Sequence, residues 1–527
     1  MTRRLRAVVE PPHDGVTGRP GICVTGRQLD DLVDDAVQAL LATNTPPLLY
    51  VRGGAVVTIR RDEERRAMTA ELGETETLDR LAAASTWTRL TKDGKPLEAG
   101  PTRTLAGLVL SRLHRMEGAL PPLRGVTESP LMRADGSILA EPGYDPALRL
   151  FYAPPDGFWL PSVPERPQAA DLKLARALLD EVLFDFPFVG DADYATAVAA
   201  LVSLVLREAI DGRVPAFLFD APAPGTGKGL LADAVTVAAT GSPGAKASEP
   251  EVRGGDGEWR KRVTALLLEG RAVCVVDNVE QPLGSAALAS ALTAETWTDR
   301  ELGRSRMLTL PNRALFIVTG NNLRLRGDLP RRCVWCRLDA REARPWTREG
   351  FRHADLVGWV REHRGELLAA VFTIARGWIA AGRPGPEDGT PRLGGFESWR
   401  HVVGGVLRVA GLHGFLDNLE DFYAATDEET PAWAAFLAGW RRLYDAGAVT
   451  VAELLRQLEA PGSELRELLP GELAESLEKP AAAKRVGRAF LRKVETRYVV
   501  DAEGTTLRLV REGESRAKVA RWKVATG

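Results

Sequence analysis

A short apolar run, a loop of glycine and proline, and a lysine that opens a helix-like segment constrain this chain most. Residues 216–221 read AFLFDA, residues 222–227 read PAPGTG, and Lys228 begins KGLLADAV. A strand that turns through such a loop into a helix presents backbone N–H groups and the positive helix end to phosphates, and the lysine adds a charge. The segment predicts a nucleoside triphosphate site made by Pro224, Gly225, Thr226, Gly227, Lys228, Gly229 and Leu230.

This loop departs from the pattern G-x-x-x-x-G-K-[ST] at two positions. Pro222 occupies the first glycine position, and Gly229 occupies the position of the serine or threonine. The missing hydroxyl is normally a ligand of Mg²⁺, so a water or Thr226 would have to replace it.

Two further apolar runs end in polar residues suited to this chemistry. The run 272–276 (AVCVV) is followed by Asp277, and a buried parallel strand would deliver that carboxylate to its C-terminal end, where it can hold Mg²⁺. The run 314–319 (ALFIVT) leads into Gly-Asn-Asn, whose amides at Asn321 or Asn322 would orient the attacking water. The alternative for Gly-Asn-Asn is a simple turn.

Arginines follow in two places. Arg331 and Arg332 come directly after Gly-Asp-Leu-Pro and suit a finger that stabilises transition-state charge, with a solvated pair as the alternative. A hairpin predicted around Leu302-Gly303 carries Arg300, Arg304 and Arg306. These three side chains would grip DNA phosphates or reach a neighbouring subunit's nucleotide, and the sequence leaves both interpretations open.

Composition describes a globular protein of several domains. A chain of 527 residues with 45% hydrophobic and 27% charged residues predicts roughly three domains. No apolar run approaches a membrane span, no signal peptide is seen, and four cysteines favour a reducing compartment, so we expect a cytoplasmic protein without a membrane partner. The motif CVWC at 333–336 favours a buried strand over a metal site.

The basic C-terminal part is the expected duplex DNA contact. From Lys479 to the end there are 13 lysine and arginine residues against 5 acidic residues. Basic side chains cluster on a predicted helix, and a hairpin from Tyr498 to Arg511 would form the wing of a winged helix. The helix carries Lys484, Arg485, Arg488, Arg492 and Lys493.

Together the segments APAPGTGKGLL, CVVDN, WTDRELGRS, FIVTGNN and GDLPRRC resemble the ATPase of superfamily 3 helicases in the AAA+ class. More narrowly, they are similar to primase-helicase ATPases of phages, plasmids and integrated elements, and the resemblance covers about residues 168–345. It implies an α/β fold with an AAA+ P-loop ATPase core at 166–385. A mixed α+β helicase-associated domain at 1–165 would precede the core, and a helical and winged-helix region at 386–527 would follow it.

The resemblance also implies roles for these residues. Subunits would form a ring, expected to be a hexamer, with ATP and Mg²⁺ between subunits and single-stranded DNA in the channel. Lys228 would contact phosphates, Asp277 would hold Mg²⁺, Asn321 or Asn322 would be the sensor, and Arg331 or Arg332 the finger. Asn278 stands where many relatives carry a second acid, so the general base is unassigned, with Glu258 and Glu280 as candidates.

The resulting hypothesis is an ATP-dependent DNA helicase or translocase of a phage or mobile element that acts in replication. No polymerising site is visible, so a primase would be a separate protein. Two alternatives remain: a remodelling ATPase that does not unwind DNA, and an initiator that binds DNA under the control of ATP but hydrolyses it poorly.

Overall fold

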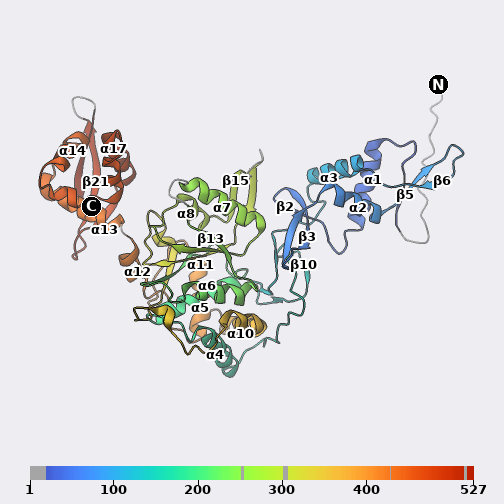
Figure 1. The fold of residues 1–527 in the computed structure, drawn as a ribbon, viewed down its shortest axis with the longest axis horizontal. Helices are drawn as coiled ribbons and strands as arrows, with labels where there is room; N and C mark the ends of the chain where they lie inside the picture. Colours follow the sequence, from blue (N-terminus) through green and yellow to red (C-terminus); the bar gives the residue numbers. More distant parts are fainter. Residues whose placement is uncertain (1–18, 251–254, 301–306, 428, 515–518) are drawn as a thin grey trace. The chain divides into compact units, whose positions relative to one another are not determined.

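We describe residues 19–250, 255–300, 307–427, 429–514 and 519–527 in a computed structural model of the chain. The chain divides into two compact units, which are described separately. The first contains Met1–Asn278, Ala287–Asn321 and Val334–Asp417, and the second contains Val279–Ala286, Asn322–Cys333 and Asn418–Gly527. The structure is mixed α/β, with a parallel sheet and many helices (Figure 1).

The first unit begins with small sheets and three helices. The order is β1 (Gly21–Cys23), α1 (Leu29–Ala42), β2 (Tyr50–Arg52), β3 (Ala55–Arg61), β4 (Ala67–Glu71), α2 (Glu74–Ala84), β5 (Thr86–Leu90), β6 (Pro96–Glu98) and α3 (Arg103–Arg115). Short strands follow: β7 (Gly125–Thr127), β8 (Leu131–Met132), β9 (Ile138–Leu139), β10 (Gly143–Asp145) and β11 (Leu150–Tyr152). The apolar faces of α1, α2 and α3 share one buried cluster with Trp87.

A five-stranded sheet forms the centre of the first unit. Its strands are β12 (Ala216–Ala221), β13 (Ala245–Ser248), β14 (Val273–Val279), β17 (Leu315–Asn321) and β18 (Cys333–Arg337), in the spatial order β13-β14-β17-β12-β18. Strands β12 and β17 run parallel with Ala221 opposite Asn321, and β13 and β14 run parallel with Ser248 opposite Asp277. The strand order therefore brings residues that are far apart in sequence to one carboxyl edge.

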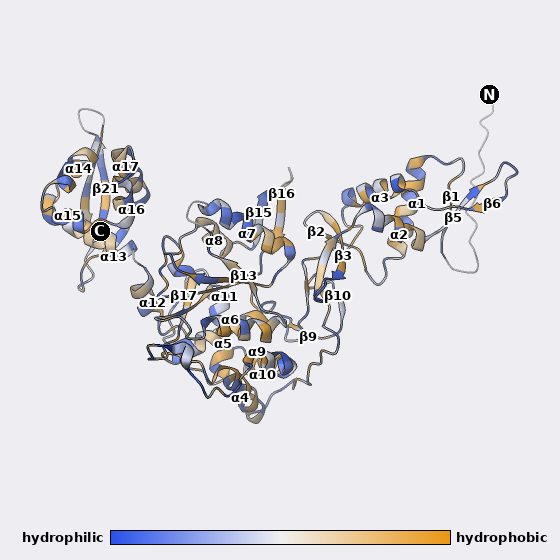
Figure 2. Ribbon diagram, in the orientation of Figure 1, coloured by the Kyte–Doolittle hydropathy of each residue, from blue (hydrophilic) through white to orange (hydrophobic). Residues whose placement is uncertain are grey.

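Helices of mixed polarity accompany the strands of this sheet along the chain. They are α4 (Ala169–Leu183), α5 (Asp191–Val205), α6 (Lys228–Thr240), α7 (Gly255–Glu269), α8 (Ala286–Ala291), α9 (Leu356–Glu362), α10 (Arg364–Ala380) and α11 (Glu397–Val409). Hydrophobic residues extend along α6 and α10 (Figure 2), and most residues of both helices are buried. This burial is why these segments form helices of the core rather than amphipathic surface helices.

Arginines, of which Arg52 is buried, join the N-terminal part of this unit to its helices. Arg52 of β2 donates from Nη2 to the carbonyl of Leu267 in the last turn of α7, at 2.6 Å. Arg124 pairs with Glu208, whose other oxygen lies 3.4 Å from Nε of Arg313. Burial lowers the pKa of Arg313, with the repulsion of Arg124 adding to this and the attraction of Glu208 opposing it.

The second unit contains a helical group around a small sheet. Its elements are the 3₁₀ turn Pro330–Arg332, α12 (Leu419–Thr426), α13 (Glu429–Tyr444), β19 (Val449–Thr450), α14 (Val451–Glu459), α15 (Glu464–Glu467), α16 (Gly471–Leu477), α17 (Ala482–Lys493), β20 (Arg497–Val499), β21 (Thr506–Glu514) and β22 (Ala520–Thr526). The sheet order is β19-β22-β21-β20. Helices α14 and α17 lie beside β21 (Figure 1), and Trp433, Trp440, Phe490 and Trp522 fill the core.

Two expectations about strands and membranes can be compared with this fold. The motif at 333–336 is the buried strand β18, as predicted from its apolar pattern. In the described part of the chain, none of the helices has the length and apolar character needed to cross a bilayer.

Candidate nucleotide site

The loop between β12 and α6 needs glycine at two positions. Gly225 and Gly227 have φ values of 76° and 106°, in the left-handed region that side chains rarely adopt. A side chain at position 225 is excluded by space as well, because its Cβ would lie 2.8 Å from Cβ of Trp346. Helix α6 begins directly after the loop at Lys228, and its first N–H groups have no partner within the helix. The loop is therefore shaped as the sequence predicts, with a helix N-terminus at its end.

Lys228 lies beneath the loop and contacts the predicted sensor. It is 8% exposed, and its Nζ donates to Oδ1 of Asn321 at 2.7 Å and to the carbonyl of Ala223 at 3.3 Å. Burial lowers the pKa of Lys228, while Asp220 and Asp277 oppose this by attraction. The structure thus brings Lys228 and Asn321 together, and it distinguishes Asn321 from Asn322, which is exposed with φ 48°.

Asp277 lies near the end of β14 and is oriented by a residue that the sequence analysis did not select. Its Oδ1 accepts a hydrogen bond from Oγ1 of Thr319 at 2.6 Å, and the same Oγ1 accepts from the backbone N–H of Asn278 at 3.0 Å. Thr319 belongs to β17, between the strands of the loop and of Asp277. It was missed because a threonine inside an apolar run is typical of any strand.

A magnesium ion would find few protein ligands here. Asp277 is a half-buried carboxylate beside the loop lysine, which suits Mg²⁺ coordination through one carboxylate, waters and phosphates. The hydroxyl of Thr226 is buried and donates to the carbonyl of Ala223 at 2.7 Å, so it is engaged elsewhere. Gly229 offers no oxygen in its side chain. The residues fit a magnesium ion held by Asp277 and phosphate oxygens.

A cavity of about 320 Å³ opens beside the loop. Gly225, Thr226, Gly227 and Leu230 form one wall. The remaining walls come from the end of α4 and from residues 345–356, including Phe186, Trp346, Phe351 and His353. Aromatic and aliphatic walls next to the glycine loop and the N-terminus of α6 suit a nucleoside. This cavity was not predicted because its walls come from three separate segments without a shared pattern, the last of them more than 100 residues after the loop.

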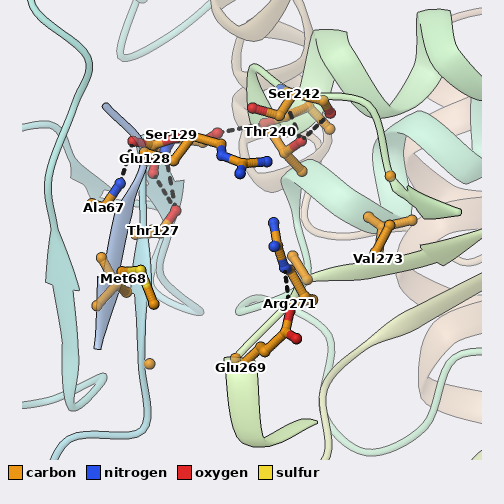
Figure 3. A pocket seen from close by; sticks show the side chains of 18 of the residues that line it. Ala67, Met68, Thr127, Glu128, Ser129, Thr240, Ser242, Glu269, Arg271 and Val273 are labelled. Carbon is orange, nitrogen blue, oxygen red and sulfur yellow. Dashed lines mark hydrogen bonds and ion pairs between the residues drawn. The ribbon is translucent and has the colours of Figure 1, made fainter. Parts of the chain in front are cut away.

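A second cavity, of about 390 Å³, lies at the other end of α6 and is distinct from the nucleotide site. Figure 3 shows residues of β4 and β7 on one side and residues of the α6–β13 and α7–β14 connections on the other. Ser129 donates to the carbonyl of Ala239 in the last turn of α6 at 2.5 Å. Arg364 of α10 donates to the same Ser129 hydroxyl.

The two predicted finger arginines differ in exposure. Both lie in the turn Pro330–Arg332 of the second unit and both bind the carboxylate of Asp328, with Nη2 of Arg331 at 2.7 Å. The side chain of Arg331 is 61% exposed and that of Arg332 is 12% exposed. Of the two, Arg331 is the side chain that solvent or another molecule can reach. We refer to residues 327–332 as the arginine turn.

Two strands on either side of the predicted turn pair with each other, and the turn at Leu302-Gly303 lies outside the described residues. Strands β15 (Thr296–Arg300) and β16 (Met307–Pro311) pair antiparallel, with the exposed Arg300 opposite Met307. Arg304 and Arg306 lie outside the described residues. Beside β15, Arg260 of α7 pairs with Asp299 at 2.9 Å.

Helix α17 carries the predicted basic cluster on its exposed side. Lys484, Arg485, Arg488 and Arg492 are exposed, and Arg492 pairs with Glu472. Lys493 differs, because it is half-buried in an ion pair with Glu429.

The remaining titratable candidates give no further site. Glu258, one possible general base, pairs with Lys261 on its own helix at 3.2 Å. Glu280, the other, is exposed. Within the described ranges, no group of three or more His, Cys, Asp or Glu side chains is arranged to hold a metal ion.

Comparisons with known proteins show no family. No protein family matches the chain, and no curated protein matches it. Among solved structures, the A-form apo structure of the NrS-1 C-terminal region is similar at 12% identity, over 87% of this chain and 100% of that chain, with a TM-score of 0.34. The A-form apo structure of NrS-1 C-terminal region residues 305–718 is similar at 11% identity, over 89% and 96%, with a TM-score of 0.33. Similarity at this level supports no conclusion about fold or function.

Proposed function

We propose that this protein binds ATP with Mg²⁺ at the loop 222–230 and hydrolyses it. The observation that carries the proposal is the contact between Lys228 and Asn321 at the carboxyl edge of the sheet, with Asp277 close enough to act electrostatically on the lysine. A lysine held over the loop can meet phosphate oxygens, and a carboxylate nearby can share a metal ion with them. The adjacent cavity of about 320 Å³ has room and apolar walls for the nucleoside.

In this proposal each residue has a limited task. Lys228 neutralises phosphate charge, and its partial burial strengthens that interaction relative to water. Asn321, fixed by Lys228, would orient the attacking water, and Asp277, fixed by Thr319, would hold Mg²⁺. Bound Mg²⁺ would supply charge neutralisation at the phosphate oxygens. Arg331, the exposed arginine, would act on the nucleotide of a neighbouring subunit in a ring.

We further propose that ATP turnover drives movement on DNA, as a helicase or translocase of a phage or mobile element. Support comes from the motif order in the sequence, from the exposed cations of α17 and from Arg300 on the β15–β16 hairpin. Exposed arginines and lysines in a row are the usual contact to a phosphate backbone.

A second function is favoured by one specific observation. The only hydroxyl in the loop, that of Thr226, is engaged with Ala223, and Gly229 lacks one, so Mg²⁺ has few ligands. A protein that binds ATP as a switch for DNA binding, with slow hydrolysis, would fit this arrangement.

Calorimetry of the full chain with ATP and Mg²⁺ tests the proposal. We expect saturable heat for the unaltered protein and none for Lys228→Ala, with thermal unfolding of both proteins compared to confirm that the variant is folded. Two further assays, steady-state ATP turnover and strand separation of a labelled forked DNA duplex, then distinguish the three possible functions. Turnover with strand separation supports a helicase, turnover alone a remodelling ATPase, and binding alone a switch. No heat from the unaltered, folded protein would refute ATP binding.

A further inference from the structure

Glu429, the first residue of α13, contacts two functional segments at once. Its Oε2 accepts a hydrogen bond from the backbone N–H of Gly327 at 3.1 Å, and its Oε1 pairs with Nζ of Lys493, the last residue of α17. The side chains of Glu429 and Lys493 are only 23% and 22% exposed, so the ion pair is weakly screened. The carboxylate of Glu429 thus joins the arginine turn to helix α17.

Glu429 binds Gly327, the residue directly before the aspartate that holds both arginines of the arginine turn. Gly327 has φ 67° and is followed by Asp328, whose carboxylate binds both Arg331 and Arg332. The segment just before the turn is also anchored, because Leu325 donates to the carbonyl of Thr426 at 2.9 Å. A change in the hydrogen bond of the Gly327 N–H therefore affects the position of the neighbouring Asp328.

Lys493, the other partner of Glu429, adjoins the exposed cations of α17. Lys484, Arg488 and Arg492 recur every four residues, so they follow one face of the helix. Lys493 follows Arg492 at the end of the helix and is 22% exposed, so a phosphate backbone that continues past this end would meet its ammonium. The ammonium would then be shared between phosphate and Glu429.

We infer that Glu429 couples nucleic acid bound at α17 to the arginine turn, and through it to the nucleotide. The inference rests on the proposed function and adds a regulatory contact to it. When phosphate draws Lys493 away, the full charge of Glu429 acts on the N–H of Gly327, and a hydrogen bond to an undivided carboxylate is stronger. The turn is then held more firmly with Arg331 exposed to a neighbouring nucleotide, so DNA raises nucleotide affinity.

The test measures coupling as a binding ratio. The affinity of the full-length protein for a labelled short DNA duplex is determined with and without a non-hydrolysable ATP analogue and Mg²⁺, and analogue affinity is determined with and without the duplex. Linkage requires the two ratios to be equal, and typical couplings are roughly 5- to 150-fold. Because no hydrolysis is needed, slow turnover leaves this experiment intact.

Three variants separate coupling from stability. Lys493→Met removes the ion pair and should raise analogue affinity without DNA to the DNA-bound value. Glu429→Gln keeps an acceptor for Gly327 but loses the charge, so analogue affinity should stay at the DNA-free value. Both should bring the coupling ratio to about one. Lys523→Met is the control, since Lys523 forms an ion pair with Glu512 within the sheet of the same unit, and it should keep the wild-type ratio.

The outcomes are distinct. Wild-type coupling retained in Lys493→Met and Glu429→Gln overturns the inference, and so does a wild-type ratio of one in a protein that binds both ligands. Loss of coupling in Lys523→Met as well would also overturn it, because any disturbance of the unit would then suffice. Failure of the unaltered protein to bind the analogue would instead refute the proposed function itself.

Discussion

Gly229 offers a gain-of-function test of the nucleotide site. It is the second residue of α6, its φ lies outside the left-handed region, and a Cβ added there would meet no described atom within 4 Å. Gly229→Ser therefore adds a hydroxyl next to the phosphate loop without displacing anything. The position is the one at which the sequence pattern expects a hydroxyl ligand of Mg²⁺.

Two effects of this change can be estimated. Replacing glycine in a helix gains up to about 1 kcal/mol in the free energy of unfolding, and in a unit of this size about 1 kcal/mol raises Tm by roughly 1 °C. Replacing one water ligand of Mg²⁺ by a fixed hydroxyl should lower the Mg²⁺ concentration for half-maximal turnover roughly three- to tenfold, which corresponds to about 0.7–1.4 kcal/mol.

The assay is steady-state ATP turnover as a function of Mg²⁺, together with thermal unfolding. Gly229→Ala is the matched control, because it gives the same Cβ and at least the same gain in helix stability without an oxygen. We expect both variants to raise Tm and only Gly229→Ser to shift the Mg²⁺ dependence. Equal Mg²⁺ curves for the two variants would refute the placement of the metal beside residue 229.

Three further results are expected. Arg331→Ala should lower turnover roughly 10³-fold, and mixing with the loop-lysine variant should restore part of it; no recovery in steady-state assays of the mixture would contradict action between subunits. Trp346→Ala should raise the half-saturating ATP concentration roughly fivefold with little change in kcat, because Trp346 lines the cavity; an unchanged value would exclude it from the site. Near pH 8, a thiol reagent should modify Cys23 first, because burial raises the pKa of Cys274 and Cys333 to about 12 and keeps these thiols protonated. Rapid labelling of all four cysteines in the native protein would contradict the burial of β14 and β18.

The order of strand, glycine loop and helix at 216–240 could be predicted from sequence because its determinants are local. Strand, glycine turn, lysine and helix follow one another within about 20 residues, and each has a strong composition pattern. The sequence also placed Asn321 or Asn322 at the end of a buried strand, and the structure adds the contact of Asn321 with Lys228 at the edge where parallel strands end. These inferences need only the pattern of apolar residues in a strand and the fact that parallel strands end at the same edge of a sheet.

Features that depend on tertiary packing could not be predicted in this way. Arg331 and Arg332 are identical in type and adjacent, and only the fold around Asp328 leaves one exposed and the other covered. Lys493 continues a basic run in the sequence, yet it faces Glu429, which precedes it by more than 60 residues. The nucleoside cavity likewise joins distant segments that carry no common motif.

The arginines that join the N-terminal part of the first unit to its helices have a consequence for how this chain can be divided. Arg52 and Arg124 supply charge and hydrogen bonds to carbonyl groups of α7 and to Glu208, which belong to the surroundings of the central sheet. Cutting the chain near residue 165 would remove these donors together with the segments that cover their acceptors, so the acceptors would turn to water and the net contribution of each hydrogen bond, about 0.5–1.5 kcal/mol, would be lost. A fragment starting there should unfold at lower temperature, and the N-terminal segment, fused to a different protein, would keep these contacts only if that protein carried the same acceptors.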